Sequence, residues 1–396
     1  MRIITRTVWL LSIVSFLTDI ASEMLYPIMP LYLQSINFSI VLIGVLEGVA
    51  EATAGLSKGY FGKMSDMTGK RLPFVQWGYF LSALSKPMMA VFTYVWWVFA
   101  ARTLDRLGKG LRTGARDAML SDEATAQTKG RIFGFHRSLD TFGAVAGPAI
   151  ALLYLYYNPG EYVTLFLLAF APGLLAIAIT FLLKDRSGAK RSEGRSSFFA
   201  FIRYFRESPG TYKKLVFGLL AFALINSSDV FLLLKIKESG ASDTSAIGSY
   251  IFYNMVYALC SYPLGILADR IGLKRVFISG LAIFCVVYFT MAFTHTLAGF
   301  VLAFTLYGIY AAATEGIAKA WITNVVPKGQ TATAIGTYTA FQSICALFAS
   351  SFTGFLWFKF GASFALLATG GISLFIILYF LMGVPYEVKR DAKLLS

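Results

Sequence analysis

Basic side chains recur at three- and four-residue spacing along one apolar stretch of the sequence, between residues 95 and 117. The stretch contains five of them: Arg102, Arg106, Lys109, Arg112 and Arg116. Helical periodicity places the five within an arc of about 120° and over about 20 Å of helix length. Because a guanidinium suits a carboxylate or phosphate, Arg102, Arg106 and Lys109 are candidates for binding an anionic or zwitterionic small molecule. The alternative is that the stripe forms internal ion pairs with Asp105, Asp117, Glu47 and Glu51.

Carboxylates also interrupt the apolar stretches, and a poorly hydrated carboxylate has a raised pKa that lets it exchange a proton near neutrality. Asp19 and Glu23 lie one helical turn apart. Their alternative role is a permanent ion pair with the arginines of residues 102–116. The candidates for proton coupling are Asp19, Glu23, Glu47, Glu51, Asp229 and Glu315. The amide of Asn226, close to Asp229 in the sequence, is a further candidate for substrate binding.

Other chemistries have little support in the sequence. The chain has three cysteines, each within an apolar run, and two histidines, with no Cys/His cluster. We therefore expect no metal site. The sequence contains no Asp-rich diphosphate motif and no nucleotide-binding loop. We expect no cofactor and no enzymatic activity, with a membrane-embedded transferase as a remote alternative.

The elements that must position these residues are membrane-spanning helices. Hydrophobic residues make up 57% of the 396-residue chain, charged residues only 14%, and the mean hydropathy is +0.66. A soluble chain is about a quarter charged, a span needs about 20 apolar residues, and continuous apolar runs favour helices over barrel strands. The sequence thus predicts an all-α membrane protein. Twelve transmembrane helices are expected at 8–34, 40–62, 72–93, 95–117, 131–157, 161–183, 215–236, 245–268, 275–294, 297–320, 331–357 and 362–383.

The distribution of positive charge predicts the topology. The net charge is +14, and Lys and Arg accumulate on cytoplasmic loops. Nine positive and three negative residues fall within 184–214, and both termini are basic. We expect both termini in the cytoplasm of a bacterial inner (plasma) membrane protein, with membrane lipids and no nucleic acid as partners. The chain divides into an N-terminal six-helix bundle (1–183), a basic cytoplasmic linker (184–214) and a C-terminal six-helix bundle (215–396).

A loop motif occurs twice, at a constant offset of 203 residues. The first copy contains Gly62, Asp66, Gly69 and Arg71, and the second contains Gly265, Asp269, Arg270, Gly272 and Arg275. Glycines let helix ends approach closely, and an aspartate can accept hydrogen bonds at a helix N-terminus. The offset is about half of the chain, which predicts two halves related as a parallel internal repeat.

The motif G-x-x-x-D-[RK]-x-G-x-[RK]-[RK] resembles the signature loop of the major facilitator superfamily. The second copy is complete, and the first has Met67 at a position that is usually basic. The resemblance implies two six-helix bundles that rock about a central cavity, lined by the first, fourth, seventh and tenth spans. It also implies that the loop residues form a gating latch. Asp19 and Glu23 are the first candidates for proton coupling because the first span lines that cavity.

A second resemblance lies in the fifth span, where Gly143, Gly147 and Pro148 resemble the antiporter motif of exporters in this superfamily. Glycines at this spacing permit close helix packing, and the proline bends the helix. The resemblance implies a monomeric secondary active transporter that moves a small organic solute by alternating access, through proton-coupled efflux. The alternative is a proton-coupled or exchange importer of organic anions.

Overall fold

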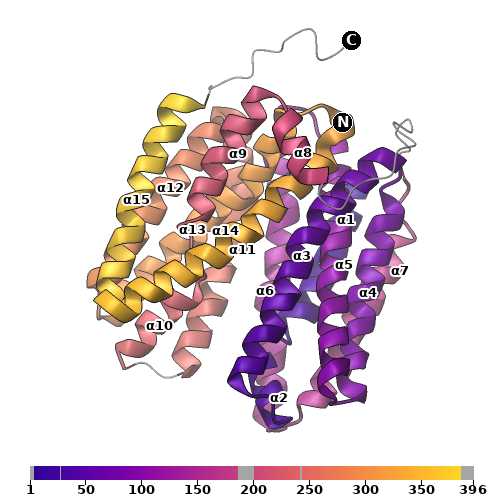
Figure 1. Cartoon of the computed structure of the whole chain (residues 1–396), viewed down its shortest axis with the longest axis vertical. Helices are drawn as coiled ribbons and strands as arrows, with labels where there is room; N and C mark the ends of the chain where they lie inside the picture. Colours follow the sequence, from indigo (N-terminus) through magenta and orange to yellow (C-terminus); the bar gives the residue numbers. More distant parts are fainter. Residues whose placement is uncertain (1–3, 27, 186–199, 241–242, 385–396) are drawn as a thin grey trace. The chain divides into compact units, whose positions relative to one another are not determined.

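The computed structural model describes residues 4–26, 28–185, 200–240 and 243–384, and its long elements are helices (Figure 1). A helix satisfies its backbone hydrogen bonds internally, as an apolar environment requires. The elements are α1 (Arg6–Glu23), α2 (Met29–Ser35), α3 (Ile40–Thr68), α4 (Leu72–Val91), α5 (Val95–Asp122), α6 (Lys129–Tyr157), α7 (Tyr162–Thr180), α8 (Ala200–Glu207), α9 (Gly210–Ala223), α10 (Val230–Glu238), α11 (Asp243–Ile271), α12 (Leu273–Phe293), α13 (Leu297–Asn324), the short 3-10 helix Lys328–Gln330, α14 (Thr331–Phe360) and α15 (Ala362–Gly383).

Helix boundaries follow local chemistry. The hydroxyls of Thr5 and Thr296 accept hydrogen bonds from backbone N–H groups in the first turns of α1 and α13, as N-cap residues do. Two glycines of the repeated motif end or begin helices with positive φ, namely Gly69 at 66° and Gly272 at 102°. That conformation is readily available to glycine, which explains why glycine stands at the same place in both motif copies.

The fold class predicted from the sequence is confirmed. Each of the twelve predicted spans coincides with a helix or, at 8–34 and 215–236, with a pair of consecutive helices. Of the helices in the described ranges, seven are both long and apolar enough to cross a membrane by composition alone: α6, α7, α11, α12, α13, α14 and α15. Charged side chains interrupt the apolar surface of α1, α3 and α5.

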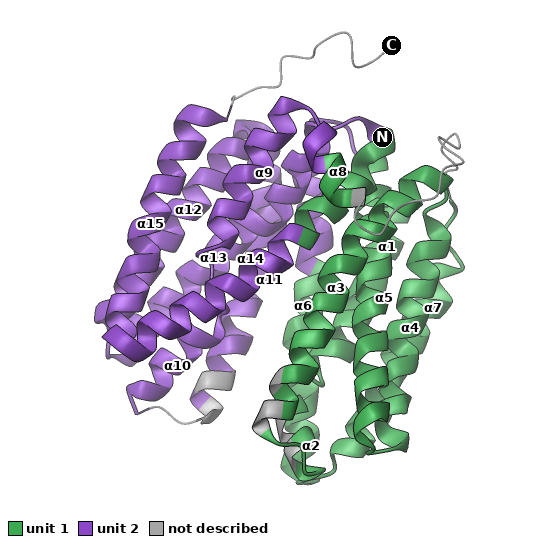
Figure 2. Cartoon of the chain, in the orientation of Figure 1, with its two compact units in different colours: residues 1–123, 139–204, 329–340 green, residues 124–138, 205–328, 341–396 purple. Residues whose placement is uncertain are grey.

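The chain forms two compact units, which Figure 2 colours separately. Unit 1 comprises residues 1–123, 139–204 and 329–340, and unit 2 comprises residues 124–138, 205–328 and 341–396. Two helices are therefore shared: α6 contributes its first turns to unit 2, and α14 contributes its first turns to unit 1. The division at 1–183, 184–214 and 215–396 stays a prediction, and residues 186–199 of that linker lie outside the described residues. The same holds for the terminal basic residues Arg2, Lys389, Arg390 and Lys393.

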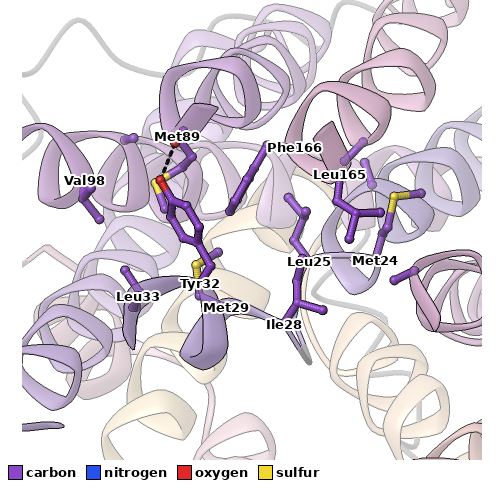
Figure 3. Close-up of a cluster of buried hydrophobic side chains, with 14 of the residues drawn as sticks. Met24, Leu25, Ile28, Met29, Tyr32, Leu33, Met89, Val98, Leu165 and Phe166 are labelled. Atoms are coloured by element: carbon purple, nitrogen blue, oxygen red, sulfur yellow. Dashed lines mark hydrogen bonds between the residues drawn. The ribbon is translucent and has the colours of Figure 1, made fainter. Parts of the chain in front are cut away.

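The apolar core of unit 1 fixes the end of α1, where Glu23 lies. Met24 and Leu25 are buried there with residues of α2, α4 and α7 (Figure 3). Tyr32 ties these elements together, because its hydroxyl donates to the carbonyl of Met89 at 2.7 Å and its ring lies 4.7 Å from that of Phe166. This cluster holds the carboxylates of α1 beside the charged helix α5.

The core of unit 2 is built largely from aromatic rings. Phe277 of α12, Trp321 of α13 and Phe380 of α15 pack with ring centroids 5.0–6.0 Å apart. Further along the same helices, Phe284 packs against Tyr288 and Tyr310 at 4.1 and 4.9 Å. Aromatic packing therefore continues along the interior of α12 and α13, where several of the rings belong to tyrosines.

Candidate functional site

The basic stripe of α5 faces acidic residues of α3. The guanidinium of Arg102 donates two hydrogen bonds to the Glu47 carboxylate, from Nε to Oε1 at 2.8 Å and from Nη2 to Oε2 at 2.9 Å. Arg106 Nη2 lies 3.9 Å from Oε2 of the same carboxylate. Arg102 also lies 3.7 Å from Asp105 on its own helix. Two of the three residues predicted to bind an anion thus contact protein carboxylates.

Lys86 is a site residue that the sequence analysis did not single out. Its Nζ donates to Asp105 Oδ1 at 2.7 Å, and both residues are buried. The hydroxyl of Ser85 donates to the same carboxylate oxygen at 3.4 Å. The available signal was a lone lysine within the predicted span 72–93, since an intramembrane charge usually has a partner.

The remaining arginines of the stripe are also held inside unit 1. Arg112 donates to the Ser82 hydroxyl at 2.7 Å and lies 4.6 Å above the ring of Tyr79. Arg116 donates to Asp117 Oδ1 at 2.9–3.0 Å and lies 4.0 Å from Asp140 of α6. These contacts stabilise the packing of α5 against α4 and α6.

Formal charges balance within this network. In the first five predicted spans, unit 1 contains seven basic and seven acidic side chains. The basic ones are Lys58, Lys86, Arg102, Arg106, Lys109, Arg112 and Arg116, and the acidic ones are Asp19, Glu23, Glu47, Glu51, Asp105, Asp117 and Asp140. A poorly hydrated interior tolerates charges only when they are compensated, and here the protein supplies the compensation itself.

Lys109 is the point where several carboxylates converge. It interacts electrostatically with Glu51 of α3 and with Asp19 and Glu23 of α1, as well as with its neighbour Arg106. Three acidic candidates from two other helices therefore lie within electrostatic range of one ammonium group. Glu51 also interacts with Lys58, Arg106 and Arg102.

The glycines of α6 bring this helix close to α1 at the same place. A Cβ added at Gly143 would lie 2.6 Å from the Cβ of Asp19, and one added at Gly147 would lie 2.6 Å from the backbone nitrogen of Met24. Pro148 follows inside α6. Small residues at these positions permit the backbone contact, which sets the carboxylates of α1 against α6.

In unit 2 the remaining candidates lie around the break between α9 and α10. Asn226 falls within this break, and its buried Oδ1 has no hydrogen-bond partner among the described residues. Asp229 stands immediately before α10 and accepts a hydrogen bond from the hydroxyl of Tyr253. Glu315 of α13 is paired with Arg137 of α6, which also donates to the Tyr257 hydroxyl. The sequence indicated the acids but not the tyrosines.

The first copy of the loop motif binds the start of α14 within unit 1. Asp66 Oδ2 accepts hydrogen bonds from the backbone nitrogen and the hydroxyl of Thr333, both at 2.7 Å. Arg71 lies 3.6 Å from Asp66 Oδ1 and 2.7 Å from Asp122. Gly62 lies under the same helix start, since a Cβ there would be 2.5 Å from the carbonyl oxygen of Ala332.

Burial raises the pKa of Asp66 to about 6, although Arg71 and the hydrogen bonds from Thr333 act in the opposite direction. Asp66 follows the predicted span 40–62 and belongs to the loop motif. Its Oδ1 is buried without a hydrogen-bond partner among the described residues, which leaves room for a proton on that oxygen.

The second copy binds the start of α6 within unit 2 in the same manner. Asp269 accepts hydrogen bonds from the backbone nitrogens of Gly130 and Arg131, at 2.8 and 2.9 Å. A Cβ at Gly265 would lie 2.3 Å from the carbonyl oxygen of Gly130. Each motif aspartate therefore accepts N–H groups at a helix N-terminus, where the helix dipole favours negative charge.

The motif's other basic residues make local contacts or stand at the helix end. Arg270 lies in the last turn of α11, and Arg275 donates to the carbonyl of Ile271 at 3.3 Å. Asp185, which the sequence analysis did not assign to the latch, accepts hydrogen bonds from the backbone nitrogens of Arg71 and Leu72 at 3.0 and 3.1 Å. In the described ranges, no group of three or more His, Cys, Asp or Glu side chains is arranged to hold a metal ion.

Known proteins share this sequence pattern and this fold. The sequence profile of the Major Facilitator Superfamily matches residues 11–254 and 230–394. An uncharacterised MFS-type transporter of Methanocaldococcus jannaschii is 31% identical over 362 residues, which cover 90% of this chain and 89% of that protein. A multi-drug resistance efflux pump PmrA homologue of Lactococcus lactis is 23% identical over 306 residues, 74% of this chain and 73% of that one.

Two solved structures share the fold at low sequence identity. The human organic anion transporter MFSD10 (TETRAN) superposes with a TM-score of 0.77 at 16% identity, covering 95% of this chain and 99% of that one. The transporter FucP in its outward conformation superposes with a TM-score of 0.78 at 14% identity, covering 96% and 99%. Because the family profile spans nearly the whole sequence and a relative exceeds 30% identity over nine-tenths of it, the chain belongs to the major facilitator superfamily and is an integral membrane secondary transporter, not an enzyme.

Proposed function

We propose that the protein is a proton-coupled exporter of a small organic solute, and that the carboxylates around Lys109 carry the coupling proton. The observation that carries the proposal is the convergence of Glu51, Asp19 and Glu23 on this one ammonium group. In a poorly hydrated site, each ionised group depends on nearby opposite charge. Protonation of one carboxylate therefore removes its attraction to Lys109 and changes the electrostatic balance between α1, α3 and α5.

The balance of charge in unit 1 bears on the substrate. A surplus of positive charge on α5 was the reason to expect an anionic solute. The seven basic side chains of this network face seven acidic ones, and Arg102 is bound bidentately by Glu47. An anion is therefore not needed to compensate α5, and this favours the export hypothesis over the import of organic anions.

Two observations support export. The glycine motif of α6, which resembles the motif of exporters, packs directly against Asp19 and the end of α1. The Lactococcus lactis relative is described as a multi-drug resistance efflux pump homologue. Export is the transport of solute from the side on which we predict both termini, the cytoplasm, in exchange for protons that enter.

The test uses purified protein in proteoliposomes with an imposed inside-acid pH gradient. Three fluorescent or radiolabelled probes cover the charge classes: ethidium as a cation, fluorescein as an anion and chloramphenicol as a neutral solute. We expect at least one probe to accumulate against its gradient. The double variant Asp19→Asn/Glu23→Gln should abolish this accumulation yet retain exchange of the same probe without a pH gradient, because exchange needs no net proton transfer.

Glu161→Gln is the matched control, since Glu161 is an exposed carboxylate before α7, far along the chain from the network. It should accumulate the probe as the wild type does. Accumulation that persists in the double amide variant would contradict the role of these carboxylates. A pH gradient that drives none of the three probes would contradict proton coupling of their transport.

A further inference from the structure

Unit 2 contains a carboxylate whose surroundings differ from those of the carboxylates in unit 1. Asp229 precedes α10 and accepts a hydrogen bond from the Tyr253 hydroxyl of α11. Among the described residues, no basic side chain forms an ion pair with Asp229. In unit 1, by contrast, Glu47 and Asp105 are bound directly by Arg102 and Lys86.

Aromatic rings pack around Tyr253, the residue that binds this carboxylate. The ring of Tyr253 lies 5.4 Å from that of Tyr250, 5.2 Å from that of Tyr307 and 6.2 Å from that of Phe304. These rings come from α11 and α13. The face of an aromatic ring attracts a cation within about 6 Å of its centre, so a carboxylate bonded to a tyrosine of such a cluster is suited to an organic cation.

The tyrosine hydroxyls argue against simple core packing. Five buried tyrosines lie in α11, α12 and α13: Tyr253, Tyr257, Tyr288, Tyr307 and Tyr310. A buried hydroxyl costs free energy unless it finds a hydrogen-bond partner, whereas phenylalanine would fill the same volume without that cost. The hydroxyls of Tyr253 and Tyr257 have partners that are charged, namely Asp229 and Arg137.

A second carboxylate in the same unit, Glu315, binds a cation of the protein itself beside a tyrosine ring. Glu315 pairs with Arg137, whose guanidinium also lies 5.3 Å above the ring of Tyr257. Tyr257 stands one helical turn after Tyr253 on α11. The two sites thus each combine an acid with a tyrosine from adjacent turns, and at one of them an arginine of the protein occupies the cation position.

A cavity adjoins the aromatic group at Phe304. It has a volume of about 490 Å³ and is lined by residues of α10, α11 and α13 and the turns beside them. Its apolar wall includes Phe252, Phe300 and Phe304, and Phe304 also contacts Tyr253. Its described lining residues include no lysine or arginine. This volume is in the range of small-molecule sites, and its walls suit an apolar body.

We infer that Asp229 and the rings of Tyr250, Tyr253 and Tyr307 bind the cationic centre of an apolar organic cation, with the apolar body of the ligand held toward Phe304 and the cavity. An apolar organic cation is then the substrate class of the proposed exporter. Only the step from a bound solute to a transported solute rests on the proposed function.

Protons compete for the same carboxylate. The titratable groups that face Asp229 are Tyr253 from α11, Tyr288 from α12, and Tyr307 and Glu315 from α13. Glu315 carries its own cation, Arg137. We therefore expect binding of a permanent cation to weaken as the pH falls, and we expect Asp229→Asn to remove this pH dependence along with most of the affinity.

The experiment compares two ions of nearly the same shape and opposite charge, tetraphenylphosphonium and tetraphenylborate. Equilibrium binding of each radiolabelled ion to the purified protein in lipid nanodiscs is measured without any gradient, and binding to empty nanodiscs is subtracted. The wild type should bind the phosphonium saturably and should not bind the borate. Asp229→Asn should lower phosphonium affinity at least about tenfold, the size expected for loss of a charged partner.

Two further variants keep the result independent of folding. Asp229→Glu retains the charge and should recover most of the affinity that Asp229→Asn loses. Glu315→Gln alters the acid that Arg137 already occupies and should change the affinity less than threefold. Saturable binding of the borate, or an Asp229→Asn protein that melts as the wild type does and binds the phosphonium equally well, would overturn the inference. If the Asp19/Glu23 variants lose gradient-driven accumulation but still bind the phosphonium, the defect lies in proton coupling, and the cation site in unit 2 is unaffected.

Discussion

The contact between Asp66 and the start of α14 should tighten as the pH falls. In the packed form, burial raises the pKa of Asp66 from 3.8 to about 6. When the segment 329–340 separates from α3, the carboxylate is exposed and its pKa returns to the ordinary value. Between these two pKa values the packed form binds more protons, so lowering the pH stabilises it and raising the pH through 6 weakens it.

The magnitude follows from the two pKa values. Between pH 7 and pH 5, the packed form gains about 1.3 kcal/mol over the open form, or about ninefold in the opening equilibrium. The groups that face Asp66 are Arg71 from the following loop, Thr333 from α14 and Tyr204 from α8. Thr333 has no ionisable side chain, and burial raises the pKa of Tyr204 further above neutrality, so we assign the pH effect to Asp66.

The assay measures how fast a buried cysteine in that segment is labelled. Ala334 is fully buried in unit 1, and Ala334→Cys would be placed in a background in which Cys260, Cys285 and Cys345 are replaced by alanine. The rate of labelling with a maleimide in detergent is divided by that of the exposed reference Asn158→Cys, which corrects for the reactivity of the thiol itself. This corrected rate should fall by about ninefold from pH 7 to pH 5.

The Asp66→Asn variant distinguishes titration of the Asp66 carboxylate from all other effects of pH on labelling. The amide can still accept a hydrogen bond from Thr333 but does not titrate, so the corrected labelling rate at residue 334 should be the same at both pH values. A corrected rate that still falls by several-fold in Asp66→Asn, or a wild type that shows no pH dependence, would refute the reasoning.

Two further predictions test the packing and pairing within unit 1. Gly143→Ala should lower the melting temperature, because its Cβ would lie 2.6 Å from that of Asp19 and overpacking costs about 1–3 kcal/mol of stability. Gly48→Ala should leave the melting temperature unchanged, since a Cβ there meets nothing within 4 Å. Equal losses in the two variants would argue against close packing of α6 on α1. Arg102→Lys should lower the free energy of unfolding by about 1 kcal/mol in the wild type, because an ammonium cannot form the two parallel hydrogen bonds and the partly exposed Glu47 keeps the effect small. The loss should be smaller in a Glu47→Gln background. A double-mutant cycle with no coupling energy would contradict a direct interaction between Arg102 and Glu47.

The helical framework was predictable because its causes are local. Apolar runs of about 20 residues fix the spans, and the spacing of glycine and aspartate in the two motif copies fixes where helices end. Gly69 and Gly272 adopt positive φ at matching places, which a sequence repeat indicates before any coordinates exist. The repeat also predicted that Asp66 and Asp269 accept hydrogen bonds at a helix N-terminus.

The partners of these residues were not predictable, because they come from helices far away in the sequence. Thr333 lies 267 residues from Asp66, and no periodicity links them. Lys86 and Asp105 belong to adjacent spans, yet which of the nearby charges pair depends on the rotation of α4 against α5. The basic stripe of α5 suggested a surplus of charge only because its neighbours on α1, α3 and α4 could not be assigned to it.

The two halves of the repeat place different chemistry at equivalent positions. At the offset of 203 residues, Glu47 corresponds to Tyr250 and Glu51 to Asn254. At the offset of 202 that relates Gly114 to Gly316, Arg102 corresponds to Phe304. The ion pairs that join α3 to α5 in unit 1 are therefore replaced by aromatic contacts between α11 and α13 in unit 2.

On the proposed function, this difference gives the two units different roles in transport. A network of balanced charges responds to a proton, because adding one changes which groups attract one another. An aromatic group with a single acid, Asp229, responds instead to a cation of suitable shape. On the proposed function, unit 1 senses the proton and unit 2 the solute, so variants of Asp19 and Glu23 should alter coupling without altering binding, and variants of Asp229 should alter binding first.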